Sequence, residues 1–196
     1  MTRLPFSKAE LQRAVEAYKQ QTSQMEPRTL DVDSLWDEES RMLAEFPETF
    51  QEAGCIPERH YLKVLTNWKG PGLWDDLAQE NTREELRNIT SEAYGLASDE
   101  TTLEPDIVRE QLKILSELDG ISAPMGSVLL TFWHPEFYTV MDQRAVASLI
   151  AATFWNGKRE ANIYEYPQYL TRCHVISEET GLSLRDIDRA LWQMGE

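Results

Sequence analysis

Apolar positions recur three to four residues apart along most of the chain, which is the period of a helix with one buried face. Ser7-Lys-Ala-Glu10 and Thr82-Arg-Glu-Glu85 have the form of capping boxes, and Ser183 precedes a third such helix. Strand-like alternation is confined to residues 137–140, too short a run to carry a sheet. We therefore predict an all-α fold of roughly ten helices.

Prolines and glycines divide this pattern into elements. Pro47 is expected to begin a short helix that Gly54 ends, and a further short helix is expected at 73–78. The 196 residues are enough for one well-buried core. We expect a single all-α domain over residues 1–196, built as one body or as two lobes with a cleft between them.

Composition narrows the class of protein. Hydrophobic residues make up 41% of the chain, which is typical of a globular protein, and neither a signal-peptide core nor a membrane-spanning run is present. A cytoplasmic location is expected. Cys55 and Cys173 are too few for a disulfide framework or a four-cysteine iron–sulfur cluster, and their spacing to His60 and His174 fits no zinc knuckle. We expect no metal and no cofactor.

The stretch from Leu118 to Ser127 combines features of a phosphate-binding hairpin. A helix ends at Leu118, Gly120 makes a tight turn, and Ile121 returns to the core. A second helix begins near Ala123, so that a helix-hairpin-helix is predicted at 105–132. The amide groups at the start of that second helix, together with its dipole, favour phosphate.

This hairpin resembles that of the helix-hairpin-helix DNA glycosylase superfamily, in which a Leu-x-Gly-Val/Ile-Gly turn precedes a small-residue helix, a short loop and an aspartate. Here Asp142 follows Thr139-Val-Met and opens another helix, as the catalytic aspartate of that family does. The stretch 123–144, the Trp68-Lys69 break and the 185–192 ending are similar to the eight-oxoguanine-glycosylase-like branch and its uncharacterised relatives.

The resemblance implies a monofunctional N-glycosylase acting on double-stranded DNA that contains a damaged base. Asp142 would stabilise positive charge on the sugar and orient or deprotonate a water molecule. Two positions depart from the family pattern. Pro124 stands where bifunctional members place a nucleophilic lysine, which excludes Schiff-base lyase chemistry from that position, and Ser122 replaces the second hairpin glycine.

Further candidates follow from this interpretation. The nucleic-acid-binding set is Gly120, Ser122, Ala123, Ser127, Lys69 and Arg144. The aromatic side chains proposed to stack on a flipped base are Trp68, Trp133 and Trp192.

The net charge of −15 opposes DNA binding, because proteins that grip phosphate usually carry excess Lys and Arg. The charge is uneven: residues 1–110 hold 23 acids and 12 bases, whereas residues 111–196 hold 11 and 7. Lysine is scarce, with 6 against 13 arginines, and an acidic, lysine-poor composition is typical of proteins adapted to high salt.

Simpler interpretations of each signal stay open. Asp142 fits a plain helix N-cap, and the hairpin fits a structural corner between two helices. Lys69 fits a solvated residue at a helix end, and tryptophans at helical spacing are often core residues. The alternatives to a glycosylase are a non-catalytic nucleic-acid-binding module and an acidic helical domain that binds a protein partner of unknown kind.

Overall fold

The computed structural model describes residues 4–69, 81–96 and 104–195, and within these ranges it is all-helical, with nine helices and no strand. This confirms the predicted fold class with one helix fewer than expected; the short helix expected at 73–78 lies outside the described residues. In chain order the helices are α1 (Lys8–Thr22), α2 (Leu35–Ala53), α3 (Glu58–Lys69), α5 (Arg83–Gly95), α6 (Pro105–Leu115), α7 (Ala123–Trp133), α8 (Gln143–Ala151), α9 (Tyr166–Thr180) and α10 (Leu184–Met194).

The predicted helix starts are set by local hydrogen bonds. Ser7 accepts a bond from the amide of Glu10, whose carboxylate accepts one from the amide of Ser7 in return. Thr82 and Glu85 make the same reciprocal pair at α5, and Ser183 caps α10. Each cap satisfies amides that have no acceptor within the helix, which fixes where the helix begins.

The expected break at Pro47 is wrong, because α2 continues through this proline to Ala53. Met42, Phe46 and Phe50 are buried at four-residue spacing on both sides of Pro47 and form one continuous apolar face. Helix α2 packs this face against α7, where the Phe46 and Phe132 rings lie 5.9 Å apart. Tertiary packing along the whole face outweighs the local cost of one proline in the helix interior.

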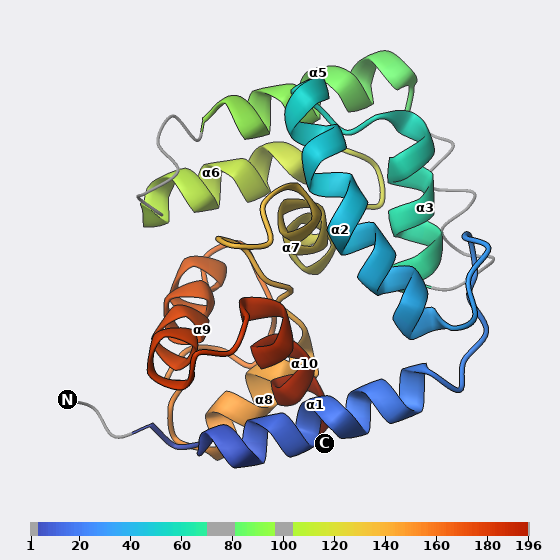
Figure 1. Ribbon diagram of the computed structural model, residues 1–196. Coiled ribbons are helices and arrows are strands. Elements are labelled where there is room, and N and C mark those ends of the chain that lie inside the picture. Colours follow the sequence, from blue (N-terminus) through green and yellow to red (C-terminus); the bar gives the residue numbers. More distant parts are fainter. Residues whose placement is uncertain (1–3, 70–80, 97–103, 196) are drawn as a thin grey trace.

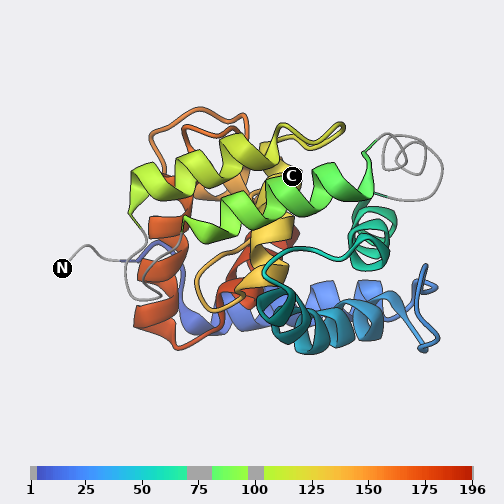
Figure 2. The same ribbon diagram turned by 90° about the horizontal axis from the view of Figure 1, so that it is seen from above.

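Two groups of helices surround α7 (Figure 1). Helix α10 packs against α1, α8 and α9 in one group, while α5 packs against α6 and α2 against α7 in the other. Figure 2 shows α5 and α6 side by side at the outer surface of their group. Of the helices in the described ranges, none combines the length and apolarity needed to cross a bilayer.

Helix α7 is the centre of the core, with every residue buried except the partly exposed Pro124. Gly126 allows α6 to approach it, since a Cβ at this position would lie 2.8 Å from the Leu112 side chain. Between these helices Gly120 has φ +79°, a left-handed conformation that favours glycine. The side chain of Asn81 holds the turn through two bonds to the backbone of Asp119, of 2.8 and 3.0 Å.

Candidate active site

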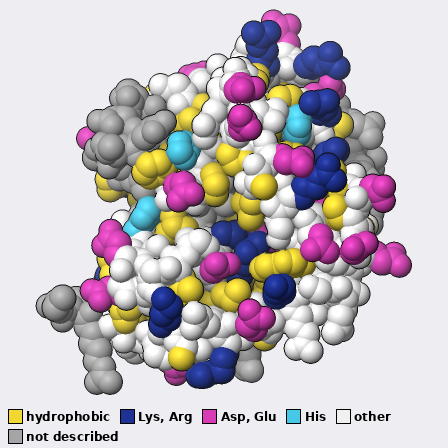
Figure 3. Space-filling view, viewed as in Figure 1, with side chains coloured by type: hydrophobic (Ala, Val, Ile, Leu, Met, Phe, Trp, Pro, Cys, Tyr) yellow, Lys and Arg dark blue, Asp and Glu magenta, His cyan; other side chains and the backbone are white. Residues whose placement is uncertain are grey.

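A pocket of about 260 Å³ opens between the two groups of helices. Its walls come from α1, α2, α3, α7 and α10, together with the connector after α1 and the segment just before α8. The space-filling view shows a hollow across the middle of one face, with basic side chains at its base and apolar side chains beside them (Figure 3). The hollow therefore combines charge with apolar surface.

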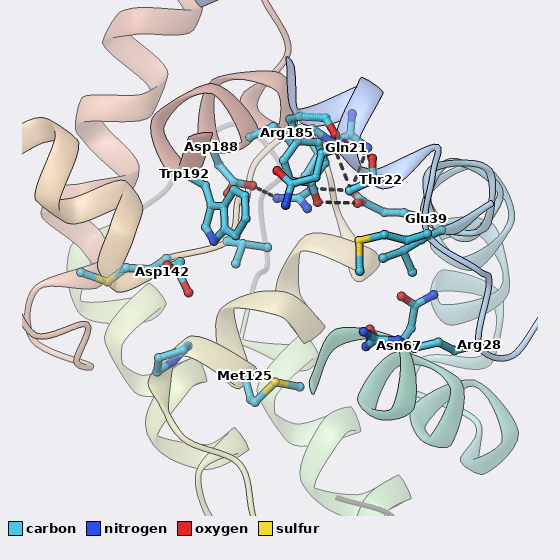
Figure 4. Close-up of a pocket in the computed structure, with 17 residues that line it drawn as sticks. Gln21, Thr22, Arg28, Glu39, Asn67, Met125, Asp142, Arg185, Asp188 and Trp192 are labelled. Atoms are coloured by element: carbon cyan, nitrogen blue, oxygen red, sulfur yellow. Dashed lines mark hydrogen bonds and ion pairs between the residues drawn. The ribbon is translucent and has the colours of Figure 1, made fainter. Parts of the chain in front are cut away.

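Asp142 and the second hairpin helix contribute to this same pocket, the latter through Pro124 and Met125. Asp142 is the N-cap of α8, and its Oδ1 accepts a bond of 2.8 Å from the amide of Arg144. The carboxylate is partly exposed and faces the pocket below Trp192 (Figure 4). One aspartate therefore both caps a helix and presents a carboxylate to the pocket.

Trp192 is the aromatic wall of the pocket, and Arg144 supports it from outside. The Arg144 guanidinium lies 3.9 Å from the centre of the Trp192 ring, and its Nε donates to the carbonyl of Gly195 at 2.8 Å. Cation–π stacking and this second anchor restrict the ring to one orientation. Trp192, predicted to stack on a base, thus lies in the pocket, whereas Arg144, predicted to bind nucleic acid, packs on the Trp192 ring and does not line the pocket.

The opposite wall is polar and is formed by Arg28 and Asn67 (Figure 4). Arg28 lies in the connector after α1, and its Nη1 donates to the backbone carbonyl of Asn67 at 2.6 Å. The buried carboxylate of Glu38 organises this connector by accepting bonds from the amides of Arg28, Thr29 and Leu30 at 2.6–2.8 Å. An amide and a guanidinium are therefore held in place across the pocket from Asp142.

A buried cluster of charges closes the inner end of the pocket. Glu39 of α2 accepts bonds from Arg185 at 2.6 Å and Arg189 at 2.7 Å, both on α10. Burial alone would raise the pKa of Glu39, but the two guanidinium groups outweigh it and lower this pKa to about 2. Arg189 also stacks over Trp36, 4.3 Å from the ring centre. The cluster joins α2 to α10 through charge-assisted bonds.

Asp188, the second carboxylate of the cluster, pairs with Arg185 and is 2% exposed. Burial raises the pKa of Asp188 to about 6, although Arg185 acts in the opposite direction. Its Oδ2 lies 3.2 Å from the hydroxyl oxygen of Thr139, three residues before Asp142. The cluster therefore reaches the segment that carries the candidate catalytic residue.

Two hairpin residues predicted to bind nucleic acid are buried. Ser127 is fully buried; its hydroxyl donates to the carbonyl of Pro124 at 2.6 Å and accepts from the amide of Met141 at 3.0 Å. Ser127 thus serves to hold the segment before Asp142 and does not face a phosphate. Ala123 is 8% exposed, so only its backbone amide remains a candidate contact.

Gly120 and Ser122 lie at the surface of the hairpin. Gly120 is partly exposed at the turn, and Ser122 is exposed as the N-cap of α7, without a side-chain capping bond. Neither residue lines the pocket; they lie four and two residues before Pro124, which does. The start of α7 is accordingly placed next to the pocket.

Trp133 was predicted to stack on a flipped base, and this prediction is wrong. Its ring is 8% exposed and stacks on Tyr94, with 4.0 Å between the ring centres, and it also lies beside Tyr138. It belongs to the core and does not line the pocket. Trp68 and Lys69 belong to the end of α3, but their side chains are not among those that the structure describes. Cys55 and Cys173 are buried, free thiols.

Sequence reasoning missed the polar residues opposite Asp142 and the charge cluster. Asp188 and Arg189 lie three and four residues after Arg185 on one helix face, which was a usable sign of a joint role. Glu39, Arg28 and Asn67 gave no such signal, because ordinary surface helices and loops carry the same residue types. Within the described ranges, no group of three or more His, Cys, Asp or Glu residues could hold a metal ion.

Comparison with protein-family models, curated proteins and solved structures matches none of them.

Proposed function

We propose that this protein is a monofunctional DNA N-glycosylase, with Asp142 as its catalytic carboxylate. The observation that carries the proposal is that Asp142, the start of the second hairpin helix and Trp192 all border one pocket. This combination supplies the three things that base excision needs: a contact for the backbone, a stacking surface for the base and a charge beside the sugar.

In this proposal a base leaves the duplex and enters the pocket beside Trp192. Its ring stacks on the indole that Arg144 holds in place, with Met125 as a further apolar contact. Asn67 and Arg28 offer hydrogen-bonding groups to the edge of the base from the opposite wall. Stacking and edge contacts offset the cost of unstacking, which is a few kcal/mol and lowest for a damaged or mismatched base.

The reaction proposed for Asp142 is hydrolysis of the bond between the base and C1′ of its sugar. As this bond breaks, positive charge builds on the sugar, and an adjacent carboxylate stabilises it. Water then supplies the hydroxyl that bonds to C1′, and the departing base takes up the proton. Pro124 offers no amine at the start of α7, so no covalent sugar–enzyme intermediate is proposed there.

The acidic composition places a condition on this function. A net charge of −15 repels a polyanion at low ionic strength, and this repulsion between exposed charges is screened at molar salt. Phosphate contact is then proposed to depend on the amides at the start of α7 and on shape, more than on a basic surface.

The experiment is an excision assay with duplexes that carry oxidised, alkylated or deaminated bases, at low and at molar salt. Asp142→Asn should abolish excision. Asparagine is also a good N-cap, so the helix start is retained while the charge is removed. Asp106→Asn, at an exposed aspartate on α6, is the matched control and should excise normally.

Three outcomes would contradict the enzyme or the role of Asp142 in it. If no duplex is cleaved under either salt condition, the glycosylase proposal fails. Cleavage that persists in Asp142→Asn would move the chemistry to another residue. Duplex binding without cleavage, unchanged in Asp142→Asn, would instead indicate a binding module.

A further inference from the structure

The segment that carries Asp142 is held by buried bonds at two points. Thr139 is fully buried: its carbonyl accepts a bond of 2.9 Å from the hydroxyl of Tyr166, and its own hydroxyl contacts Asp188 and the Leu184 carbonyl. Two residues on, the amide of Met141 donates to the hydroxyl of Ser127. Asp142 follows directly and begins α8. The position of its carboxylate thus depends on how this short segment is anchored.

Asp188 is the charged member of these anchors, and it belongs to the cluster at the inner end of the pocket. Asp188 pairs with Arg185, which in turn pairs with Glu39 of α2, and Asp188 also contacts Thr139. These contacts together connect α10 and α2 with the Asp142 segment. Other groups near it are Arg189 on its own helix, Tyr18 of α1, and Tyr166, Tyr169 and Cys173 of α9. Asp188 therefore lies on α10 where residues of α1, α2 and α9 meet the catalytic segment.

A buried ion cluster requires an explanation other than stability. Removing charges from water costs several kcal/mol per ion, and well-packed apolar side chains often serve the fold as well or better. Buried charges with shifted pKa values beside a pocket are therefore candidates for a functional role. Here the cluster contacts the one segment whose placement the proposed chemistry needs.

We propose that Asp188 is a positioning residue, which fixes Thr139 through its hydroxyl and thereby sets the place of the Asp142 carboxylate in the pocket. The inference rests on the proposed function for its effect on rate, but its structural part is tested independently. Asp188 itself touches neither base nor sugar in this scheme.

The structural test is amide hydrogen exchange at Met141 and Arg144, the two amides whose bonds hold the segment and the Asp142 cap. In Asp188→Asn and in Thr139→Val, exchange at both amides should rise about tenfold, the change expected when about one hydrogen bond is lost. Thr139→Ser keeps the hydroxyl and should restore wild-type exchange. Thr180→Val, which removes a buried hydroxyl bonded to a backbone carbonyl of α9, should leave both amides unchanged.

The functional test is single-turnover excision by the same variants, with duplex affinity measured in parallel. A positioning role predicts a fall in rate of about tenfold or more with little change in affinity, since only the transition-state interaction is disturbed. If Asp188→Asn does not fold, Thr139→Val decides, because it leaves the four charges of the cluster in place.

The outcomes separate the two proposals. Unchanged exchange at Met141 and Arg144 in folded Asp188→Asn and Thr139→Val overturns the positioning role, whatever the activity. Raised exchange in a protein that excises no base under any condition supports the positioning role and removes the proposed function. Equal loss of rate in Thr139→Ser and Thr139→Val also overturns it, because the hydroxyl would then be irrelevant.

Discussion

Glu39 and Asp188 share Arg185 as an ion partner and both are buried, yet the pKa values of their carboxyl groups shift in opposite directions. Glu39 has two guanidinium partners, which lower its pKa to about 2. Asp188 has one, and burial prevails, so that its pKa rises to about 6. The two carboxyl groups consequently affect the free energy of unfolding in different pH ranges. The stabilising contribution of Glu39 is present above about pH 4.5 and is lost as the pH falls toward 2.

For Asp188 the sign is reversed. Its folded pKa lies above the ordinary value of 3.8, so the folded state holds this proton more tightly than the unfolded chain does. Stability associated with this group is therefore present below pH 3.8 and lost as the pH rises through 6. Asp188→Asn has no titrating carboxyl at this position. The free energy of unfolding of the variant, relative to that of the wild type, should therefore increase from pH 4 to pH 6.

Urea unfolding of both proteins across this range, at constant ionic strength, measures the difference. Thr180→Val removes no titrating group and should differ from the wild type by a constant amount. A constant difference for Asp188→Asn as well would mean that the pKa of this carboxyl is the same in the folded and the unfolded protein.

Single residues were predictable where their role is local. Asp142 was expected as the start of a helix and is one, because N-capping depends only on the next few residues. Ser127 was expected to face DNA and is buried, because its environment is set by the segment 139–142, which is brought to it by the fold. The prediction that Trp133 stacks on a base was wrong for the same reason, because its core neighbours Tyr94 and Tyr138 are brought to it by the fold.

At the level of elements, the sequence contains enough information for the helix caps and for the helix-hairpin-helix. The sequence-based prediction was wrong at Pro47. Local propensity predicts that a helix ends there, whereas long-range packing lets α2 continue. The difference is that capping involves neighbours in sequence, whereas the Met42–Phe46–Phe50 face is stabilised by α7, some eighty residues later.

The α6–α7 contact leads to a prediction about Gly126. In Gly126→Ala the new methyl group would meet the Leu112 side chain at 2.8 Å, so one of the two helices or the leucine must move. We expect a loss of about 1–3 kcal/mol in the free energy of unfolding, typical of overpacking in a core.

Gly95→Ala is the matched control for this substitution, because a Cβ at the end of α5 meets nothing within 4 Å. That variant should be neutral or more stable by up to about 1 kcal/mol, since alanine favours helix over glycine. Chemical denaturation of both variants gives the comparison. Equal effects would show that α6 and α7 are not in the close contact described.

On the scale of the whole molecule, the pocket could not be derived from the sequence. Its walls come from residues as far apart as Tyr18 and Trp192, and their proximity depends on α1 packing along α10. Periodicity identifies the buried face of each helix but not its partner. Only the Asp142 side of the site followed from the sequence.

Net charge gives a prediction at this same scale. With a charge of −15 the folded chain repels itself, and the range of this repulsion falls from about 30 Å at 0.01 M salt to about 3 Å at 1 M. The melting temperature should therefore rise with NaCl over this range, by roughly 2–4 °C for each kcal/mol of repulsion relieved.

Thermal unfolding followed by circular dichroism measures this shift. A sucrose series, which leaves charge unscreened, separates it from the general effect of solutes excluded from the surface. A melting temperature that is insensitive to NaCl would show that the acidic groups are already compensated in the folded state.

The bonds from Glu38 to the connector after α1 have a consequence for how this chain can vary in evolution. The carboxylate holds the loop mainly through main-chain amides, which every residue except proline provides. In a library of variants or a set of orthologues, positions 29 and 30 should accept many side chains, while position 38 should tolerate almost nothing but glutamate. The geometry of the pocket wall that contains Arg28 thus depends mainly on one side chain, Glu38, some ten residues away. The side chains at positions 29 and 30 of the connector are then free to change.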